Sequence, residues 1–280
     1  MSRVAPQRSV VRLTIGSTPE RRRDVLAGEE PLELRVDGRS LAVTMRTPGA
    51  DFDLAAGFLV SEGVIAHRED LRSMRYCAGR DVDEANRFNV LDIHLGAGVT
   101  PPGDDVARAF FTTSSCGLCG KSSIAAVRTR SRFDLHDDQF EVTASTLATL
   151  PDRIRAAQRV FDQTGGLHGA ALCSTSGELL VLREDVGRHN AVDKVVGWAL
   201  REGRLPLRQT ILLVSGRASF ELVQKAVMAG VAMLCAVSAP SSLAVDLAEE
   251  AGLTLVGFLR PPSMVVYAGA ERVRDLATLE

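Results

Sequence analysis

The alternation of apolar and polar positions changes its character near residue 106. In the first part, short alternating runs flank the turn signal Asp37-Gly38, and an apolar stripe at helical spacing begins at Asp51 and ends at Gly63. Strands are expected at residues 32–36, 41–45, 71–77 and 88–95. Residues 96–105 include Pro101-Pro102-Gly103, which indicates a loop at a boundary between domains.

Beyond this loop, continuous apolar runs of strand length alternate with helical patterns. Strands are expected at 108–112, 170–173, 179–182, 211–214, 233–237 and 253–258. Helices are expected after Lys121 and at 145–161, 190–200, 220–229 and 243–251. This order predicts the α/β class, with a sheet covered by helices on both faces.

Three parts follow from these patterns. Residues 1–30 are polar and rich in arginine, and we predict a loose lead-in with one strand at 10–15. Residues 31–106 are expected to form a smaller β-rich N-terminal subdomain, and residues 107–280 the α/β domain.

Composition narrows the class of protein. Of the 280 residues 45% are hydrophobic and 24% charged, which is ordinary for a globular protein and excludes a wholly disordered chain. The net charge of −2 gives no basic field for nucleic acid. The longest apolar run, 226–237, is shorter than the roughly 20 residues of a membrane span. No signal peptide is recognisable and the five cysteines are odd in number, so we expect a cytoplasmic protein without a disulfide framework.

The pair Cys116 and Cys119 is the first candidate for chemistry. It lies among serines, threonines and glycines, and a following helix N-terminus together with Lys121 would lower the pKa of a thiol there. The remaining cysteines have apolar neighbours and are expected in the core; they are Cys77, Cys173 and Cys235.

Several interpretations of the pair remain open at this point. A zinc knuckle would need His168 or His189 as further ligands, and a thioredoxin-like redox pair or a persulfide carrier would need no metal. A zinc deaminase has His-x-Glu before Pro-Cys-x-x-Cys, whereas here the order is reversed, Ser115 replaces the proline and Ala170 the glutamate. Incidental placement of the two cysteines is a further alternative.

Three polar turns between a strand and a helix are the second candidate; they lie at residues 183–194, 215–221 and 238–242. Turns at the carboxyl edge of an α/β sheet bind ligands, and backbone N–H groups at helix starts suit anions. Arg188, Arg217 and Lys194 could contact phosphates, and two of only three lysines lie in or next to these turns. The alternatives are solvated helix starts, a plain helix cap at Ser219 and Glu221, and a core role for His168. Walker A and Gly-x-Gly-x-x-Gly motifs are absent.

Together these segments resemble the FdhD/NarQ family of formate dehydrogenase accessory sulfurtransferases, in the same order from Glu30 to Tyr267. The matching motifs are Thr-Pro-Gly at 47–49, Gly-Phe-Leu-Val-Ser-Glu-Gly at 57–63, Ser-Cys-Gly-Leu-Cys-Gly at 115–120, Thr-Gly-Gly-Leu-His at 164–168, Arg-Glu-Asp-Val-Gly-Arg-His-Asn-Ala-Val-Asp-Lys at 183–194, Ser-Gly-Arg-Ala-Ser-Phe-Glu at 215–221 and Pro-Ser-Ser-Leu-Ala-Val-Asp at 240–246.

The resemblance implies a three-layer cytidine-deaminase-like domain with a mixed sheet, and a homodimer. It also implies that Cys116 accepts a persulfide from a cysteine desulfurase, with Cys119 as second thiol. Sulfur would then pass to the molybdenum cofactor, bis-molybdopterin guanine dinucleotide, which formate dehydrogenase requires; no zinc is expected. The alternative is a cofactor-binding chaperone without sulfur chemistry.

The resemblance also implies a cofactor-binding stretch before Val-Tyr at 266–267, where the family has Phe-Asn and this chain has Met264-Val265. Its residues are Phe258, Leu259, Arg260, Pro261, Pro262 and Ser263. The other residues expected to bind the cofactor are Lys121, His168, Arg188, His189, Lys194, Ser215, Gly216, Arg217 and Ser219.

Overall fold

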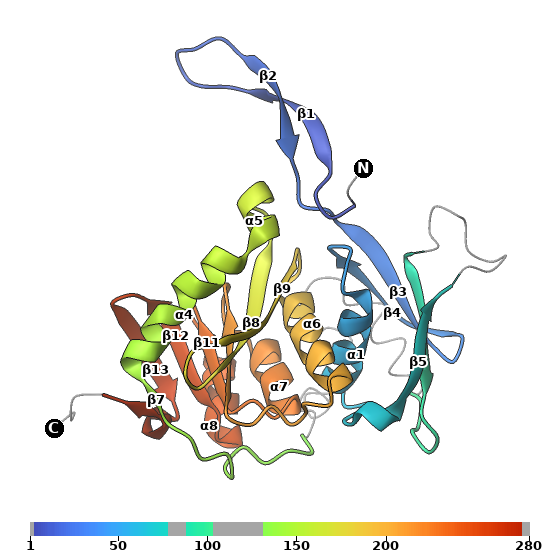
Figure 1. Cartoon of the computed structure of the whole chain (residues 1–280), viewed down its shortest axis with the longest axis vertical. Coiled ribbons are helices and arrows are strands. Elements are labelled where there is room, and N and C mark those ends of the chain that lie inside the picture. The colour runs from blue at the N-terminus through green and yellow to red at the C-terminus, as the bar shows by residue number, and fades with distance from the viewer. Residues whose placement is uncertain (1–2, 78–87, 103–130, 276–280) are drawn as a thin grey trace.

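A six-stranded mixed sheet forms the centre of the molecule in a computed structural model that describes residues 3–77, 88–102 and 131–275 (Figure 1). Its strands run in the order β13-β12-β11-β10-β8-β9. They are β8 (His168–Ser174), β9 (Leu179–Asp185), β10 (Thr210–Val214), β11 (Met233–Ala236), β12 (Thr254–Arg260) and β13 (Ser263–Ala268). Strands β10, β11 and β12 are parallel, whereas β8 is antiparallel to both of its neighbours. The predicted α/β class with a mixed sheet is confirmed.

Helices cover both faces of this sheet because its strands are apolar on both sides. The helices are α4 (Ala144–Ala157), α5 (Arg159–Thr164), α6 (Arg188–Arg201), α7 (Phe220–Met228) and α8 (Ser242–Ala251). Ala170 and Leu172 belong to the apolar cluster that includes α6, α7 and α8. Their neighbours Ala171 and Cys173 point to the opposite face, where they pack with Leu147 of α4. Successive side chains of one strand therefore serve two cores.

The N-terminal part adds a four-stranded sheet and one helix. The elements are β3 (Glu30–Val36), β4 (Arg39–Arg46), α1 (Asp51–Ser61), η1 (Arg68–Asp70), β5 (Leu71–Tyr76) and β6 (Val90–Leu95), with strand order β4-β3-β6-β5. Helix α1 packs against α6, and the crossing requires glycine: a Cβ on Gly57 would lie 1.8 Å from the carbonyl oxygen of Asp193. One continuous core joins β3, α1 and α6, so residues 31–106 have their own sheet but share their core with the rest.

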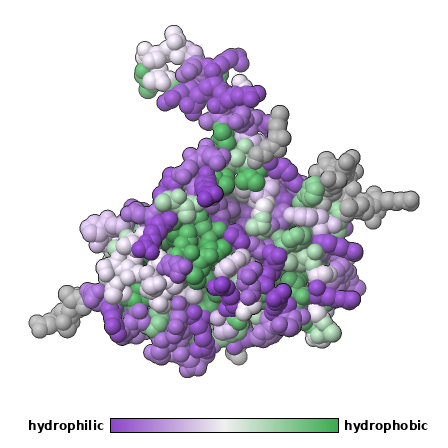
Figure 2. Space-filling model, viewed as in Figure 1, coloured by the Kyte–Doolittle hydropathy of each residue, from purple (hydrophilic) through white to green (hydrophobic). Residues whose placement is uncertain are grey.

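The first 30 residues differ from the prediction. Strands β1 (Gln7–Arg12) and β2 (Glu20–Val25) form a hairpin that pairs with no other described strand and stands away from the body (Figures 1 and 2). The strand predicted at 10–15 is confirmed only at residues 10–12, which belong to β1, because Leu13 and Ile15 lie beyond β1 with 75% and 105% of their surface exposed; β2 was not predicted. Both faces of the hairpin are exposed, so there is no buried side to produce an apolar alternation.

Other differences concern element ends. The helix predicted at 145–161 ends at Ala157 and α5 begins at Arg159, and β13 was not predicted. A short parallel pair, β7 (Val142–Thr143) and β14 (Val273–Arg274), and the turn η3 (Ala270–Arg272) complete the described elements. The strand predicted at 108–112 and the helix after Lys121 lie outside the described residues. No helix in the described ranges is long and apolar enough to cross a membrane.

Candidate functional site

Three turns from a strand into a helix meet at one edge of the six-stranded sheet, as the sequence predicted. Strands β9, β10 and β11 run in the same direction and end at this edge, where α6, α7 and α8 begin. Strand β8 runs the other way, so its first residue, His168, also lies here, paired with Asp185. Hydrogen bonds of 2.9 Å, from Gly169 N to Ser215 Oγ and from Ser215 N to the Gly169 oxygen, fix β8 against the β10 turn.

His168 is a half-buried imidazole in a positively charged neighbourhood. Burial and the nearby Arg188 and His189 side chains lower the pKa of His168 below its usual value of 6.5, so its ring is neutral at pH 7. The β10 turn passes directly beside the ring, since a Cβ on Gly216 would lie 3.5 Å from His168 Nδ1, an ordinary van der Waals contact. A neutral imidazole at a sheet edge can accept or donate a hydrogen bond to a ligand.

Most polar residues of the β9–α6 segment are engaged in a buried network instead of facing the edge. Lys194 and Asp185 are buried and their charged atoms lie 2.6 Å apart. The Lys194 ammonium also donates to the carbonyl oxygen of Thr47 at 2.8 Å, and Thr47 N donates to Asp185 Oδ2. Asn190 Nδ2 donates to Asp185 Oδ1 and to the oxygen of Met45. This geometry does not favour Lys194 as a phosphate ligand.

Lys225 repeats this arrangement on α7. Its ammonium is paired with Asp193 at 2.7 Å, and Asp193 also accepts a hydrogen bond from Ser61 Oγ of α1. Two of the three lysines are therefore internal partners of carboxylates. The compact ammonium group explains why lysine occurs at these two places in a chain otherwise rich in arginine.

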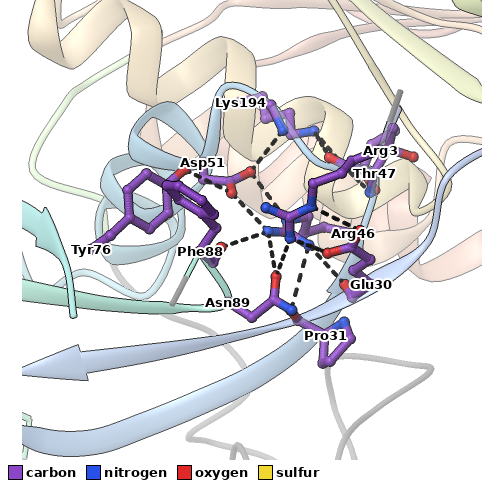
Figure 3. Close-up of polar contacts among 12 residues, drawn as sticks. Arg3, Glu30, Pro31, Arg46, Thr47, Asp51, Tyr76, Phe88, Asn89 and Lys194 are labelled. Carbon is purple, nitrogen blue, oxygen red and sulfur yellow. Dashed lines mark hydrogen bonds and ion pairs between the residues drawn. The ribbon is translucent and has the colours of Figure 1, made fainter. Parts of the chain in front are cut away.

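Thr47, whose carbonyl oxygen accepts a hydrogen bond from Lys194, lies in a turn that is anchored by a buried arginine, Arg46 (Figure 3). Arg46, with no exposed surface, binds Asp51 through two hydrogen bonds of 2.9 and 3.1 Å and donates to the oxygens of Glu30 and Phe88. Tyr76 donates to the same Asp51, and burial together with that carboxylate raises the pKa of Tyr76 to about 12. Arg46 and Asp51 thus fix the N-terminal turn, whose Thr47 contacts Asp185 and Lys194 of the β9–α6 segment.

A second set of polar groups at the edge has no such partners. Among the described residues, the buried atoms Arg188 Nε, His189 Nε2 and Ser219 Oγ make no hydrogen bond. Ser219 occupies the N-cap of α7, yet its side chain caps no backbone N–H. Unpartnered buried donors are rare in proteins and indicate a ligand or bound water. They mark this part of the edge as the candidate binding site.

Glu221 in the first turn of α7 faces the same groups. Its Oε2 lies 3.9 Å from His189 Nε2, beyond hydrogen-bond distance. Burial alone would raise the pKa of Glu221, but the proximity of His189 and Ser219 outweighs it and lowers the pKa to about 2. The carboxylate is therefore charged at every physiological pH. The sequence showed Glu221 only as a helix-capping residue, so its place at the edge was not predicted.

Some of the remaining predicted site residues lie along the same sheet edge, and the others lie outside the described residues. Arg217 is exposed in the β10–α7 turn. The stretch 258–263 lies at the end of β12 on the same edge, where Phe258 N donates to the oxygen of Ser238 and Arg260 Nε to that of Val237. Cys116, Cys119 and Lys121 lie outside the described residues.

Two of the described cysteines have unreactive thiol groups. Cys173 and Cys235 are buried in the core under α4, where burial raises the pKa of Cys173 to about 11 and that of Cys235 further. Their thiolate forms are suppressed at pH 7. Cys77 is partly buried after β5. In the part of the chain that the structure describes, no group of three metal-ligating side chains could hold a metal ion.

Comparison with known proteins agrees with this architecture. A family model described as the FdhD/NarQ family matches residues 27–274. The sulfur carrier protein FdhD of Mycolicibacterium paratuberculosis is 60% identical over 270 residues, covering 96% of this chain and 99% of the relative. The protein of the same name from Streptomyces coelicolor is 61% identical over 274 residues, covering 98% and 97%.

A solved structure shares the fold. The crystal structure of a protein from Desulfotalea psychrophila, described as a formate dehydrogenase accessory protein, superposes with a TM-score of 0.77 at 22% identity, covering 96% of this chain and 99% of that one. With the family model extending from β3 into β14 and the relatives matching almost end to end, the chain belongs to the FdhD/NarQ family.

Proposed function

We propose that this protein is a sulfur carrier that serves formate dehydrogenase. Cys116 accepts a persulfide from a cysteine desulfurase, and the sulfur then passes to bis-molybdopterin guanine dinucleotide before that cofactor enters formate dehydrogenase. The observation that carries the proposal is the match of nearly the whole chain, at 60–61% identity, to relatives named sulfur carrier proteins.

The environments of the cysteines support Cys116 and Cys119 as the reactive pair. In the loading step, a Cys116 thiolate attacks the outer sulfur of the donor's persulfide; the S–S bond of the donor breaks and its cysteine leaves as a thiolate. Such a step needs an accessible, ionisable thiol. Cys173 and Cys235 do not meet this condition because burial raises the pKa of both.

The polar edge supports binding of the cofactor as cargo. The starts of α6 and α7 bring backbone N–H groups, Arg188 and Ser219 to one place, which suits phosphate oxygens. Arg217 and the stretch 258–263 lie along the same edge. The cofactor would extend from the β10–α7 turn towards the end of β12.

Three further features belong to this proposal. A cytidine-deaminase-like fold is supported by the mixed sheet, whose first strand β8 is antiparallel to its neighbours, with helices on both faces. A homodimer and a cytoplasmic location follow from the family resemblance and from the composition of the chain.

Mass spectrometry of the intact protein tests the sulfur step. After incubation with a cysteine desulfurase and cysteine, we expect the wild type to gain one or more sulfur atoms and Cys116→Ala to gain none. Cys119→Ala separates the roles of the two thiols, and Cys77→Ala is the matched control that keeps the gain. No gain in the wild type would overturn the carrier mechanism. Normal formate dehydrogenase activation by the double variant Cys116→Ala/Cys119→Ala would then support the chaperone alternative.

A further inference from the structure

The β1–β2 hairpin, residues 7–25, is an arm that the candidate site does not use. It projects from the body, and most of its side chains are exposed on both faces (Figures 1 and 2). A two-stranded hairpin gains little stability by itself in water, because neither face is packed against a core. Its unpaired edges are also open to other chains. Nothing inside the described fold therefore accounts for the arm, which is what a contact with another molecule would explain.

The two faces of the arm differ in charge. Residues directly opposite each other in an antiparallel pair lie on the same face. On one face, the two outer arginines each lie opposite a carboxylate, Arg8 opposite Asp24 and Arg12 opposite Glu20. The other face, called the basic face below, carries two arginines and no carboxylate. Its residues are Gln7, Ser9, Val11, Arg21, Arg23 and Val25.

The positive charge of the basic face is not compensated within the described residues. Arg23 donates one hydrogen bond, of 3.4 Å, to the neutral side chain of Gln7, and Arg21 has no ion-pair partner in the part of the chain that the structure describes. By contrast, Arg22 on the opposite face pairs with Asp24 at 3.4 Å. Arginines that only protect a sheet edge from aggregation need no such separation of charge. The basic face is thus complementary to an acidic surface.

The tip of the arm adds an apolar contact to this charge. Leu13 and Ile15 lie between the two strands of the hairpin and are among the most exposed large apolar side chains of the described residues. Burial of such side chains is favourable on binding, and exposed apolar groups next to arginines are typical of protein-binding surfaces. The arm therefore fits a protein surface on which carboxylates surround an apolar hollow.

The root of the arm lies beside the candidate site. Residues 26–28 continue the pairing with residues 4–6 through hydrogen bonds of 2.8 and 2.9 Å. A Cβ on Gly166 would lie 3.2 Å from the Cβ of Ala27, so the root contacts the turn that leads into β8. Strand β8 begins with His168 at the candidate-site edge. Figure 1 shows the arm projecting beyond this end of the sheet. A protein bound to the arm is therefore brought to the edge where the cargo is proposed to bind.

We propose that the basic face and the tip of the arm dock on an acidic surface of formate dehydrogenase. This inference rests on the proposed function, in which the cofactor passes from this edge into that enzyme. Formate dehydrogenase is the partner that receives the cargo, so it has to approach the edge beside which the arm stands. The charges of Arg21 and Arg23 steer the encounter, and burial of Leu13 and Ile15 prolongs it.

Binding measurements with variants of the two faces test the proposal. Cofactor-free formate dehydrogenase from the same organism is immobilised on a biosensor, and the affinity is measured at low and at physiological ionic strength. Arg21→Gln/Arg23→Gln should weaken binding by about tenfold or more, because charge-assisted contacts are lost. Arg8→Gln/Arg12→Gln is the matched control: it removes the same charge from the opposite face and should keep the affinity within about threefold.

Two further measurements separate the contributions. Binding by the wild type should weaken as salt is added, and the basic-face variant should lose most of this dependence. Leu13→Ser/Ile15→Ser should also weaken binding by about tenfold while it keeps the salt dependence, because only apolar burial is removed. All variants should load sulfur on Cys116 like the wild type, since the arm is separate from the core.

Several outcomes would overturn the inference. They are the absence of wild-type binding, unchanged binding by the basic-face and tip variants, and an equal loss from the control pair. Sedimentation velocity identifies the alternative occupant: a dimer that dissociates in Arg21→Gln/Arg23→Gln, with binding to formate dehydrogenase unchanged, would assign the arm to a second copy of this chain. A wild type that loads no sulfur would refute the proposed function itself, independently of where formate dehydrogenase binds.

Discussion

The polar residues at this edge of the sheet form two regions that differ in whether they have partners: a buried network of Asp185, Asn190 and Lys194, and an open region at the starts of α6 and α7. In the β9–α6 segment, Asp185, Asn190 and Lys194 are buried and connected to one another and to residues 45–47. In the β10–α7 turn, Ser219 has no hydrogen-bond partner among the described residues, and Glu221 faces His189 at 3.9 Å. A dense run of polar residues therefore does not identify a binding site, whereas unpartnered polar groups at a sheet edge do.

The physical reason for the difference is the N-terminal part of the chain. Residues 45–47 supply backbone oxygens and an N–H group to the β9–α6 segment, because α1 crosses α6 closely enough to place them there. No corresponding element among the described residues supplies a hydrogen-bond partner for Ser219 Oγ or Arg188 Nε. The predictions below use substitutions that distinguish the two regions.

The largest effect is expected from Lys194→Met. Removing the ammonium leaves the Asp185 carboxylate buried without its ion-pair partner, which costs about 3–5 kcal/mol of unfolding free energy. Arg188→Met is the matched control in the open region, and we expect its unfolding free energy to stay within about 1 kcal/mol of the wild type. Urea denaturation at pH 7 measures both. Similar losses from the two variants would contradict the distinction between the regions.

An intermediate, pH-dependent effect is expected from Glu221→Gln. Because the folded-state pKa of Glu221 is lowered from 4.5 to about 2, the ionised form stabilises the fold above the unfolded-state pKa. The variant should therefore be less stable than the wild type by about 1–3 kcal/mol at pH 7. That difference should shrink as the pH falls below 4.5 towards 2. Urea denaturation at pH 7, 5, 4 and 3 follows it, and a difference independent of pH would contradict the expectation.

The smallest effect is expected from Ser219→Ala. Although Ser219 is the N-cap of α7, its hydroxyl caps no backbone N–H, so Ser219→Ala loses only the contribution of the hydroxyl to the charged Glu221 carboxylate, and the unfolding free energy should change by less than about 0.5 kcal/mol. Ser241, the N-cap of α8, accepts a hydrogen bond from Ala244 N at 3.3 Å, and Ser241→Ala should cost about 1 kcal/mol. Thermal and urea denaturation of the two variants compare these caps. A full capping loss at Ser219 would show that its hydroxyl is engaged within the fold.

The sequence pattern predicted the α/β part well and the hairpin poorly. Strands β8 to β12 and helices α6 to α8 lie where the apolar runs placed them, because burial on both faces leaves a strong signal. Hairpin β1–β2 buries neither face, so its residues carry no periodic signal. The break between α4 and α5 at Gln158 was also missed, since no proline or glycine marks it in the sequence.

The sequence predicted which residues lie near the candidate site. Only the structure distinguished those that are paired inside the protein from those without hydrogen-bond partners. Residues such as Arg188, His189 and Ser219 were identified by their types and by the helix starts at which they lie. Lys194 was grouped with them because its neighbours in sequence are the same. Its burial against Asp185 depends on Thr47, which is 147 residues away in the chain.

The amino-acid sequence by itself therefore determined the class of fold, the three polar turns at one edge of the sheet and the motifs of the FdhD/NarQ family. These depend on residues close together in the chain, whose periodicity and chemistry are visible locally. The tertiary structure alone decided which polar groups are satisfied internally and which remain open to a ligand. That outcome depends on contacts between distant segments, such as α1 with α6 and Glu221 with His189, and no local pattern contains them.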